Sequence, residues 1–142
     1  MKKIILVLSV FCLGFVSCNS VKKTMNKTVS LEGTWELNYV TGPRIAFAGL
    51  YPNKKPTITF DLKENSVSGS NSCNSYSGKL NVVENKINFK EPMAVTKMFC
   101  PGEGENIYMS TLQKIDSYSI SEDGKTLNLI MGDIAMMRFE KK

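Results

Sequence analysis

Apolar and polar side chains alternate along most of the chain after residue 30. In the stretch from Trp35 to Tyr39, every second residue is apolar. Other stretches with this alternation contain Ile58, Phe60 and Leu62; Leu80 and Val82; Ile87 and Phe89; Tyr118 and Ile120; Leu127, Leu129 and Met131; and Ala135, Met137 and Phe139. A period of two residues is typical of β-strands that bury one face and expose the other.

Turn-forming residues separate these stretches. The sequences KENS, VENK and SEDGK and the pair Gly132-Asp133 each lie between two alternating runs. Short strands at this spacing predict a mainly β protein, a small antiparallel and partly open β-barrel of seven or eight strands. The residues expected to point into its core are Trp35, Phe60, Leu62, Leu80, Phe89, Leu127, Leu129 and Phe139.

Two segments depart from the alternation. Residues 104–115 place apolar side chains near helical spacing, and Glu103 and Glu105 lie where the positive end of a helix dipole would be. We therefore expect one helix there, packed on the barrel through Ile107, Tyr108, Leu112 and Ile115. Residues 42–56 contain two glycines and three prolines, which predicts a long loop folded back over the barrel mouth.

The N-terminus has the pattern of an export signal. Lys2 and Lys3 precede an apolar run over residues 4–16, which is shorter than a membrane span requires. The run ends in FVSC, which resembles the lipobox of bacterial lipoproteins, although Phe15 replaces the usual leucine. This resemblance implies that residues 1–17 are a signal peptide and that Cys18 carries the lipid. The alternative is an ordinary cleaved signal in which Cys18 has no special role.

The rest of the sequence predicts a tether followed by one domain. Residues 18–30 are polar and aperiodic, as in a flexible linker, and residues 31–142 are long enough for one hydrophobic core. Asn19 follows the lipobox cysteine, where aspartate retains many lipoproteins at the inner membrane, so the outer membrane of the cell envelope is favoured. We expect a lipid-anchored monomer.

The charge pattern does not indicate nucleic-acid binding. The full chain has 18 basic and 13 acidic residues, and loss of residues 1–17 would leave 16 basic residues. These are scattered along the chain, whereas a nucleic-acid surface concentrates them. We expect no nucleic-acid partner.

Candidate catalytic groups are scarce. The chain has no histidine, which removes the commonest general base and most zinc sites. Gly124-Lys-Thr126 lacks the glycine of a phosphate loop, because Ser119 stands at that position. The carboxylates lie in polar stretches or turns. We expect no catalytic residue, metal or cofactor, and no enzymatic activity.

Two cysteines remain after export and lipidation. Cys73 lies in NSCNSYSG, and Cys100 follows 27 residues later. In an exported domain such a pair favours a disulfide, which would contribute about 3–4 kcal/mol in the chain-entropy model. Two buried thiols, or a redox pair, are the alternatives.

An ordered set of short motifs resembles the META domain, also called the HslJ-like or DUF306 family. The motifs are Gly33-x-Trp35-x-Leu37, Pro56-Thr-Ile-Thr-Phe60, Gly69-x-x-x-Cys73-Asn74-x-Tyr76-x-Gly78, Thr96-Lys-Met98-x-Cys100-Pro101, and Glu105 with Leu112. Ser72 stands where the family usually has glycine. The resemblance implies a partly open β-barrel with one helix, no established activity, and a loose association with heat shock, novobiocin resistance and, in some parasites, virulence or motility. We expect Trp35 to anchor the core, Asn74 to bond its own turn, and Gly69 and Gly78 to lie near strand ends.

Two functional hypotheses follow. The first is a non-enzymatic envelope lipoprotein that binds a protein partner or helps maintain the envelope under stress. The second is a barrel that binds a small apolar ligand or acyl chain, with a pocket formed by Phe47, Leu50, Tyr51 and Met136. A filled barrel interior favours the first hypothesis, and an enclosed apolar void favours the second.

Overall fold

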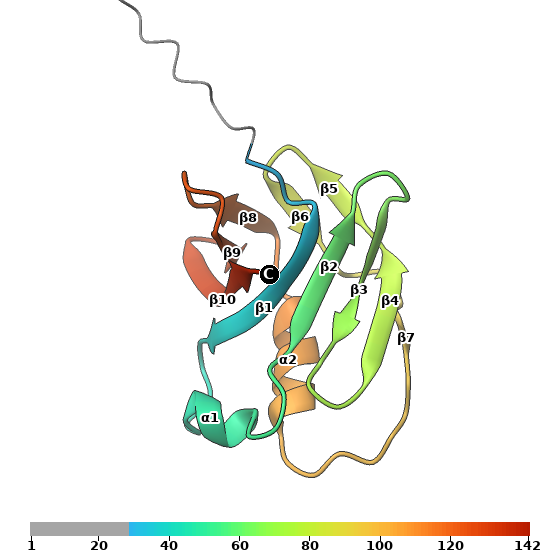
Figure 1. Ribbon diagram of the computed structural model, residues 1–142, viewed down its shortest axis with the longest axis vertical. Coiled ribbons are helices and arrows are strands. Elements are labelled where there is room, and N and C mark those ends of the chain that lie inside the picture. Colours follow the sequence, from blue (N-terminus) through green and yellow to red (C-terminus); the bar gives the residue numbers. More distant parts are fainter. Residues whose placement is uncertain (1–28) are drawn as a thin grey trace, which may run out of the picture.

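The computed structural model describes residues 29–142 as a single curled antiparallel sheet with two helices (Figure 1). The predicted mainly β fold is confirmed, with ten strands in this part of the chain rather than seven or eight. The elements are β1 (Gly33–Val40), α1 (Phe47–Leu50), β2 (Thr57–Asp61), β3 (Ser66–Ser70), β4 (Ser75–Lys79), β5 (Asn81–Val83), β6 (Lys86–Asn88), β7 (Ala94–Val95), α2 (Gly104–Leu112), β8 (Ser117–Ile120), β9 (Thr126–Met131) and β10 (Ile134–Lys141).

The sheet joins the two ends of the domain. Its strand order is β5-β6-β8-β9-β10-β1-β2-β3-β4-β7, so β1 lies between β10 and β2. Trp35 of β1 faces Ile58 of β2 on one side and Lys141 of β10 on the other. The middle of the sheet therefore depends on contacts between residues that are about 100 positions apart.

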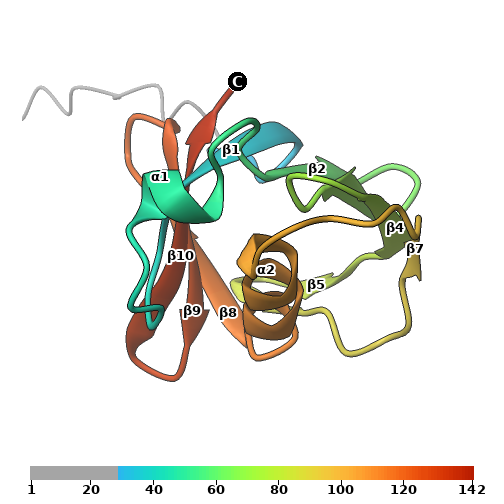
Figure 2. The same cartoon turned by 90° about the horizontal axis from the view of Figure 1, so that it is seen from below.

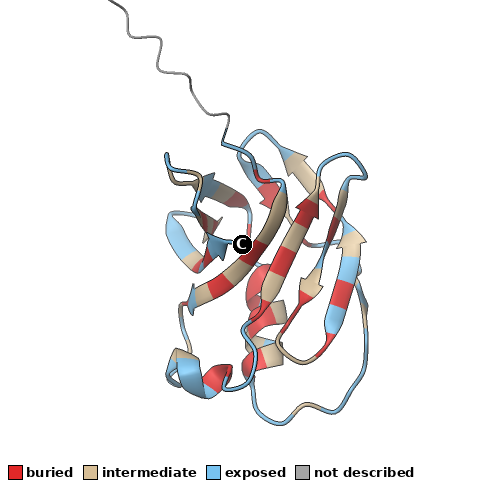
Figure 3. Cartoon of the chain, in the orientation of Figure 1, coloured by how far each residue is buried: buried red, intermediate tan, exposed pale blue. Residues whose placement is uncertain are grey.

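The strands and α2 share one hydrophobic core, and Figure 3 shows buried positions on β1, β2 and α2. Trp35 is fully buried, and its indole N–H donates to the carbonyl oxygen of Leu31 at 2.9 Å. Seven of the eight residues predicted to point inward are buried, namely Trp35, Phe60, Leu80, Phe89, Leu127, Leu129 and Phe139. The alternation of apolar and polar residues thus correctly identified the inner face of most strands.

Leu62 is the exception, and its prediction as a core residue is wrong. It is 40% exposed because β2 ends one residue earlier, at Asp61. The Asp61 side chain accepts hydrogen bonds from the backbone N–H groups of Lys63 and Glu64, at 3.0 and 2.9 Å. Such a bond from an aspartate to the following backbone starts a turn, so Leu62 lies in the β2–β3 turn.

Helix α2 lies within the curve of the sheet (Figure 2). Tyr108, Leu112 and Ile115 are fully buried and Ile107 is half-buried, which confirms the predicted packing face. The helix itself ends at Leu112, so Ile115 reaches the core from the turn that follows. Within residues 29–142, no helix has the length and apolar character needed to cross a membrane.

The segment 42–56 contains α1 and contacts the start of α2. The Tyr51 hydroxyl donates to the carbonyl oxygen of Gly104 at 3.1 Å. A Cβ atom on Gly104 would lie 2.5 Å from the carbonyl oxygen of Leu50, so only glycine permits this approach. The predicted signal peptide, Cys18 and the tether up to residue 28 lie outside the described residues.

Candidate functional site

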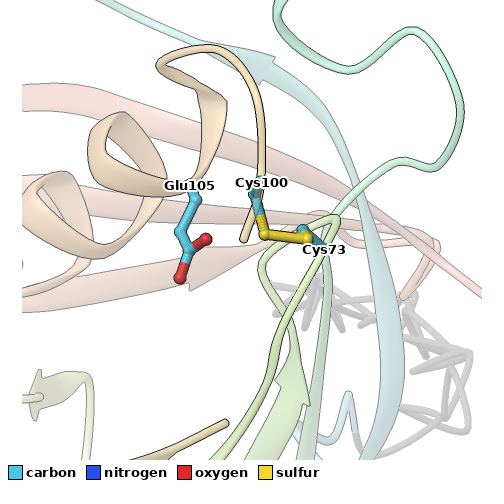
Figure 4. Close-up of side chains that lie close together, drawn as sticks. All are labelled: Cys73, Cys100 and Glu105. Atoms are coloured by element: carbon cyan, nitrogen blue, oxygen red, sulfur yellow. A yellow bond between two sulfur atoms is a disulfide. The ribbon is translucent and has the colours of Figure 1, made fainter. Parts of the chain in front are cut away.

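Three segments meet at one end of the domain around a disulfide bond. They are the β3–β4 loop (residues 71–74), the loop that joins β7 to α2 (residues 96–103) and the first turn of α2. Cys73 and Cys100 are bonded, with their Cα atoms 6.1 Å apart, which confirms the predicted pairing. Figure 4 shows the Glu105 carboxylate beside this bond. We call this region the disulfide corner.

Asn71 shapes the β3–β4 loop. Its side chain is fully buried, and its Oδ1 accepts hydrogen bonds from the backbone N–H groups of Cys73, at 3.3 Å, and Asn74, at 2.7 Å. Ser72, which lies between Asn71 and Cys73, has a φ of +94°, a value that favours glycine. Asn71 therefore closes the turn that carries Cys73.

Asn74 has a different role from the predicted one. Its side chain was expected to bond its own turn, but it binds the 96–103 loop instead. Its Oδ1 accepts from the Met98 backbone N–H and from the Thr96 hydroxyl, both at 2.8 Å. Its Nδ2 lies 3.1 Å from the Met98 carbonyl oxygen and 3.2 Å from the Cys100 Sγ. The prediction was wrong because Asn71 already satisfies the backbone of the turn.

Glu105 joins the two loops to α2. Its carboxylate accepts from Asn71 Nδ2 at 2.9 Å and from Asn74 Nδ2 at 3.0 and 3.2 Å. As predicted, it lies in the first helical turn, where the helix dipole favours a negative charge. Glu103 occupies the N-cap position but makes no side-chain capping bond.

An open depression of about 240 Å³ lies at the disulfide corner. Beside it, the 96–103 loop exposes two large apolar side chains, since Phe99 is 94% and Met98 60% exposed. The depression is lined by Leu50, Pro52, Asn53, Asn71, Ser72, Cys73, Cys100, Pro101, Gly102, Gly104 and Glu105. The corner thus combines a small hollow, lined by both polar and apolar groups, with an exposed apolar loop.

The four residues suggested for an apolar pocket lie on or in the core. Leu50 and Tyr51 are buried, whereas Phe47 and Met136 pack against the core from its edge. The rings of Phe47 and Tyr51 meet edge to face, with centroids 5.1 Å apart. Of the four, Leu50 alone lines the depression at the disulfide corner.

The pKa shifts follow hydrogen bonding and burial. A hydrogen bond from Lys142 holds the pKa of Glu36 below its ordinary value, and the Gly132 backbone N–H does the same for the pKa of Asp116. Burial raises the pKa of Tyr51 to about 12 and the pKa values of Tyr76 and Tyr108 further above their ordinary value. A general acid at neutral pH needs a carboxyl pKa that is raised, whereas the pKa values of Glu36 and Asp116 are lowered.

Two features of the disulfide corner were not predicted from the sequence. The exposure of Met98 and Phe99 was not predicted, and neither was the role of Asn71. A signal for the first was present, because these two apolar residues interrupt the polar and Gly/Pro-containing stretch 96–104 without any alternation. No signal in the sequence indicated the role of Asn71, apart from its place in a turn. Cys18, the predicted lipid site, lies outside the described residues.

Comparisons with known proteins agree on the fold. The chain resembles a solution structure of a protein from Burkholderia xenovorans, with 21% identity and a TM-score of 0.61, over 78% of this chain and 82% of that one. It also resembles a crystal structure of a DUF4847 family protein from Bacteroides vulgatus, with 15% identity and a TM-score of 0.52, over 83% and 97% of the two chains. No curated protein sequence matches it. The model of the META domain matches residues 27–142, and the chain therefore belongs to the META domain family.

Proposed function

We propose that the protein is a non-catalytic binding domain of the cell envelope, anchored by lipid on Cys18, that recognises a protein partner through the 96–103 loop. The observation that carries this proposal is the exposure of Phe99, at 94%, and Met98, at 60%, on a loop that is held in place. Aromatic residues and methionine are enriched at protein interfaces. An exposed pair of this kind is well suited to contact a partner.

The loop is restrained on both sides of Phe99. Asn74 holds the backbone N–H and carbonyl oxygen of Met98, and the disulfide holds Cys100. A restrained loop loses less conformational entropy when it binds than a free one. The two apolar side chains are thus presented to solvent by a fixed backbone.

The position of the loop fits a lipid-anchored protein. The described chain begins at residue 29, at the end of the domain opposite the loop between β7 and α2 (Figure 1). With the anchor at Cys18, the lipid would be attached through the end of the domain that lies farthest from the loop. Attachment at that end leaves Phe99 accessible to a partner in the envelope.

The filled core favours a protein partner over a small apolar ligand. Trp35, Phe60, Phe89, Tyr108 and Phe139 are among the largest side chains of the core, and each is at least 98% buried. The inner face of the sheet and α2 are thus occupied by the protein's own aromatic groups. The alternative of an acyl chain inside the barrel requires space that these side chains fill.

Crosslinking in intact cells tests the proposal. A photoreactive amino acid replaces the exposed Lys97, next to the apolar pair, and Phe99 is either kept or changed to Ala. A discrete protein adduct should form with Phe99 present and should decrease at least about tenfold in Phe99→Ala, as expected for a residue that contributes 1.4 kcal/mol or more. The matched control is Val83→Ala, because Val83 is 74% exposed but lies on β5, outside the loop. Equal adducts from all three proteins would refute the proposal.

The anchor is tested separately. Cys18→Ser should move the protein from the membrane fraction to the soluble exported fraction, because several acyl chains are needed for stable anchoring and none would be attached. Mass spectrometry of the mature N-terminus should detect the acyl groups on the native protein. An unchanged distribution and an N-terminus without acyl mass would refute lipid anchoring and would leave the test of Phe99 unaffected.

A further inference from the structure

Three potential metal-binding atoms meet at the disulfide corner. The Sγ atoms of Cys73 and Cys100 and a carboxylate oxygen of Glu105 lie within 4.8 Å of one another (Figure 4). They come from three different segments, and all three residues line the open depression of about 240 Å³. Two thiolates and a carboxylate are among the ligands that zinc uses in proteins. In the disulfide state, however, the sulfur atoms are not thiolates and do not supply this ligand set.

We propose that reduction of the Cys73–Cys100 disulfide converts the corner into a binding site for a thiophilic divalent cation of the zinc class. A protein dithiol would attack one sulfur, form a mixed disulfide and leave as its own disulfide. This exchange transfers two electrons and two protons to Cys73 and Cys100. Binding of the cation then releases those two protons to solvent as the thiolates form. Glu105 supplies the third ligand, and water takes the fourth position.

Hydrogen bonds that do not involve the disulfide hold both cysteine-bearing loops. Asn71 Oδ1 accepts from the backbone N–H groups of Cys73 and Asn74. Asn74 Oδ1 accepts from the backbone N–H of Met98, two residues before Cys100. The Cα atoms of the cysteines would thus stay near their separation of 6.1 Å after reduction. Two thiolates on one tetrahedral zinc ion lie about 3.8 Å apart, as zinc–sulfur bonds of about 2.3 Å require, which side-chain rotation can provide from these positions.

The carboxylate is already oriented by neighbours that a metal site would need. Asn74 Nδ2 donates to both oxygens of Glu105, and Asn71 Nδ2 donates to one of them. Groups that orient a ligand in this way raise the affinity of metal sites. Among the described residues, the ion pairs formed by acidic side chains involve Glu36 and Glu91 and leave Glu105 without a basic partner. A bound cation would therefore be the first positive charge to contact this carboxylate.

Metal titration of the full chain tests the site. The protein carries Cys12→Ser and Cys18→Ser so that Cys73 and Cys100 are its only cysteines. It is purified in detergent, reduced with a phosphine, freed of reductant without oxygen, and titrated with Zn²⁺ against a chromophoric chelator. We expect one Zn²⁺ per reduced chain, no binding to the oxidised chain, and a thiolate-to-metal absorption band when Co²⁺ replaces Zn²⁺. Equal binding to the two redox forms would overturn the proposal.

Matched variants distinguish a metal site that includes Glu105 from two thiols that bind the metal without it. Cys73→Ser should abolish the absorption band. Glu105→Gln should weaken Zn²⁺ binding at least tenfold, because even groups that only orient a ligand change affinity about 10–100-fold. Glu103→Gln, one residue before the helix, should leave the affinity unchanged. If Glu105→Gln binds Zn²⁺ within tenfold of the parent affinity, the thiols bind the metal without the carboxylate, and the proposed site is wrong. The same result is expected if reduction unfolds the corner, so that case also counts against the proposal.

Discussion

Ser72 has a positive φ, a backbone conformation that residues other than glycine rarely adopt. Its φ of +94° lies in a region that costs an L-residue about 1–2 kcal/mol. The conformation persists because the neighbours on each side are fixed, with Asn71 bonded to the backbone of Cys73 and Asn74, and Cys73 bonded to Cys100. The strain is therefore a property of the turn that carries the disulfide.

Ser72→Gly should stabilise the protein by about 0.5–1 kcal/mol. Relief of the positive φ contributes about 1–2 kcal/mol, and the extra freedom of glycine in the unfolded chain offsets part of it. Ser68→Gly is the matched control, since Ser68 is exposed within β3, where glycine should destabilise by about 0.5–1 kcal/mol. Urea denaturation measures both. A Ser72→Gly variant that is less stable than the native protein would contradict the assigned backbone conformation.

Asn74→Asp tests the polar network with almost no change in shape. The variant loses the Nδ2 donor and places a second carboxylate against Glu105, about 3 Å from its oxygens. At pH 7 we expect a loss of about 2–4 kcal/mol from the unmet hydrogen bonds and the like charges. Protonation of the introduced carboxylate would remove the repulsion, so the loss should shrink as the pH falls from 7 to 4.

The control for this variant is Asn106→Asp, which adds the same charge on the exposed side of the first turn of α2. Its stability should change by less than about 0.5 kcal/mol. Urea denaturation at pH 7 and pH 4 measures both variants. An Asn74→Asp penalty that is small at pH 7, or that grows toward pH 4, would contradict the network.

At the scale of elements, α2 depends on the sheet that surrounds it. A helix of nine residues is marginal in water by itself, so its stability comes from packing. Tyr108 and Leu112 of the helix, and Ile115 just after it, are fully buried among the strands. The helix is thus a part of the core, and it also sets the position of Glu105 at the disulfide corner.

Leu112→Ala should destabilise the domain by about 2–5 kcal/mol, the range for removal of a buried leucine side chain. Leu62→Ala is the matched control, because Leu62 is 40% exposed in the β2–β3 turn and should change stability by less than about 0.5 kcal/mol. Thermal or urea denaturation compares the two. Similar values for both leucines would contradict the packing of α2.

The sequence predicted elements better than it predicted their ends and partners. Alternation identified the inner faces of the strands because burial on one face is a local, periodic property. It placed Leu62 in the core because periodicity alone does not reveal that Asp61 ends β2. The Asn74 contacts with Met98 and Glu105 join segments 24 and 31 residues apart, and no local pattern encodes them. The disulfide was predictable because few cysteines were available to pair.

At the scale of the whole molecule, buried tyrosine hydroxyls link separate layers. The hydroxyl groups of Tyr76 on β4 and Tyr108 on α2 lie 2.7 Å apart, and the Tyr76 hydroxyl donates to the carbonyl oxygen of Thr57 on β2. This bond requires a glycine at position 69, because a Cβ there would lie 2.7 Å from the Tyr76 hydroxyl oxygen. Tyr51 connects the α1 segment to Gly104 in the same manner. Hydrogen bonds from buried, uncharged tyrosines therefore connect the strands and the two helical segments.

These tyrosines predict that the domain loses stability in alkali. Burial raises the pKa of Tyr51 to about 12 and raises the pKa values of Tyr76 and Tyr108 as well. In the unfolded chain a tyrosine loses its proton near pH 10. Between these values the folded state binds more protons than the unfolded state, so stability is complete below pH 10 and decreases as the pH rises toward 12. Urea denaturation at pH 7, 9, 10 and 11 should show this decrease.

Tyr51→Phe isolates one contribution to that decrease. At pH 7 the variant should be less stable than the native domain by about 1 kcal/mol, because it lacks the hydrogen bond to Gly104. Above pH 10 the difference should shrink, since phenylalanine has no proton to lose on unfolding while the native Tyr51 does. The measurement uses the chain with Cys12→Ser and Cys18→Ser, so that free thiols do not exchange with the disulfide in alkali. A difference that stays constant from pH 7 to pH 11 would show that Tyr51 titrates alike in the folded and unfolded chains, which its burial against Gly104 does not permit.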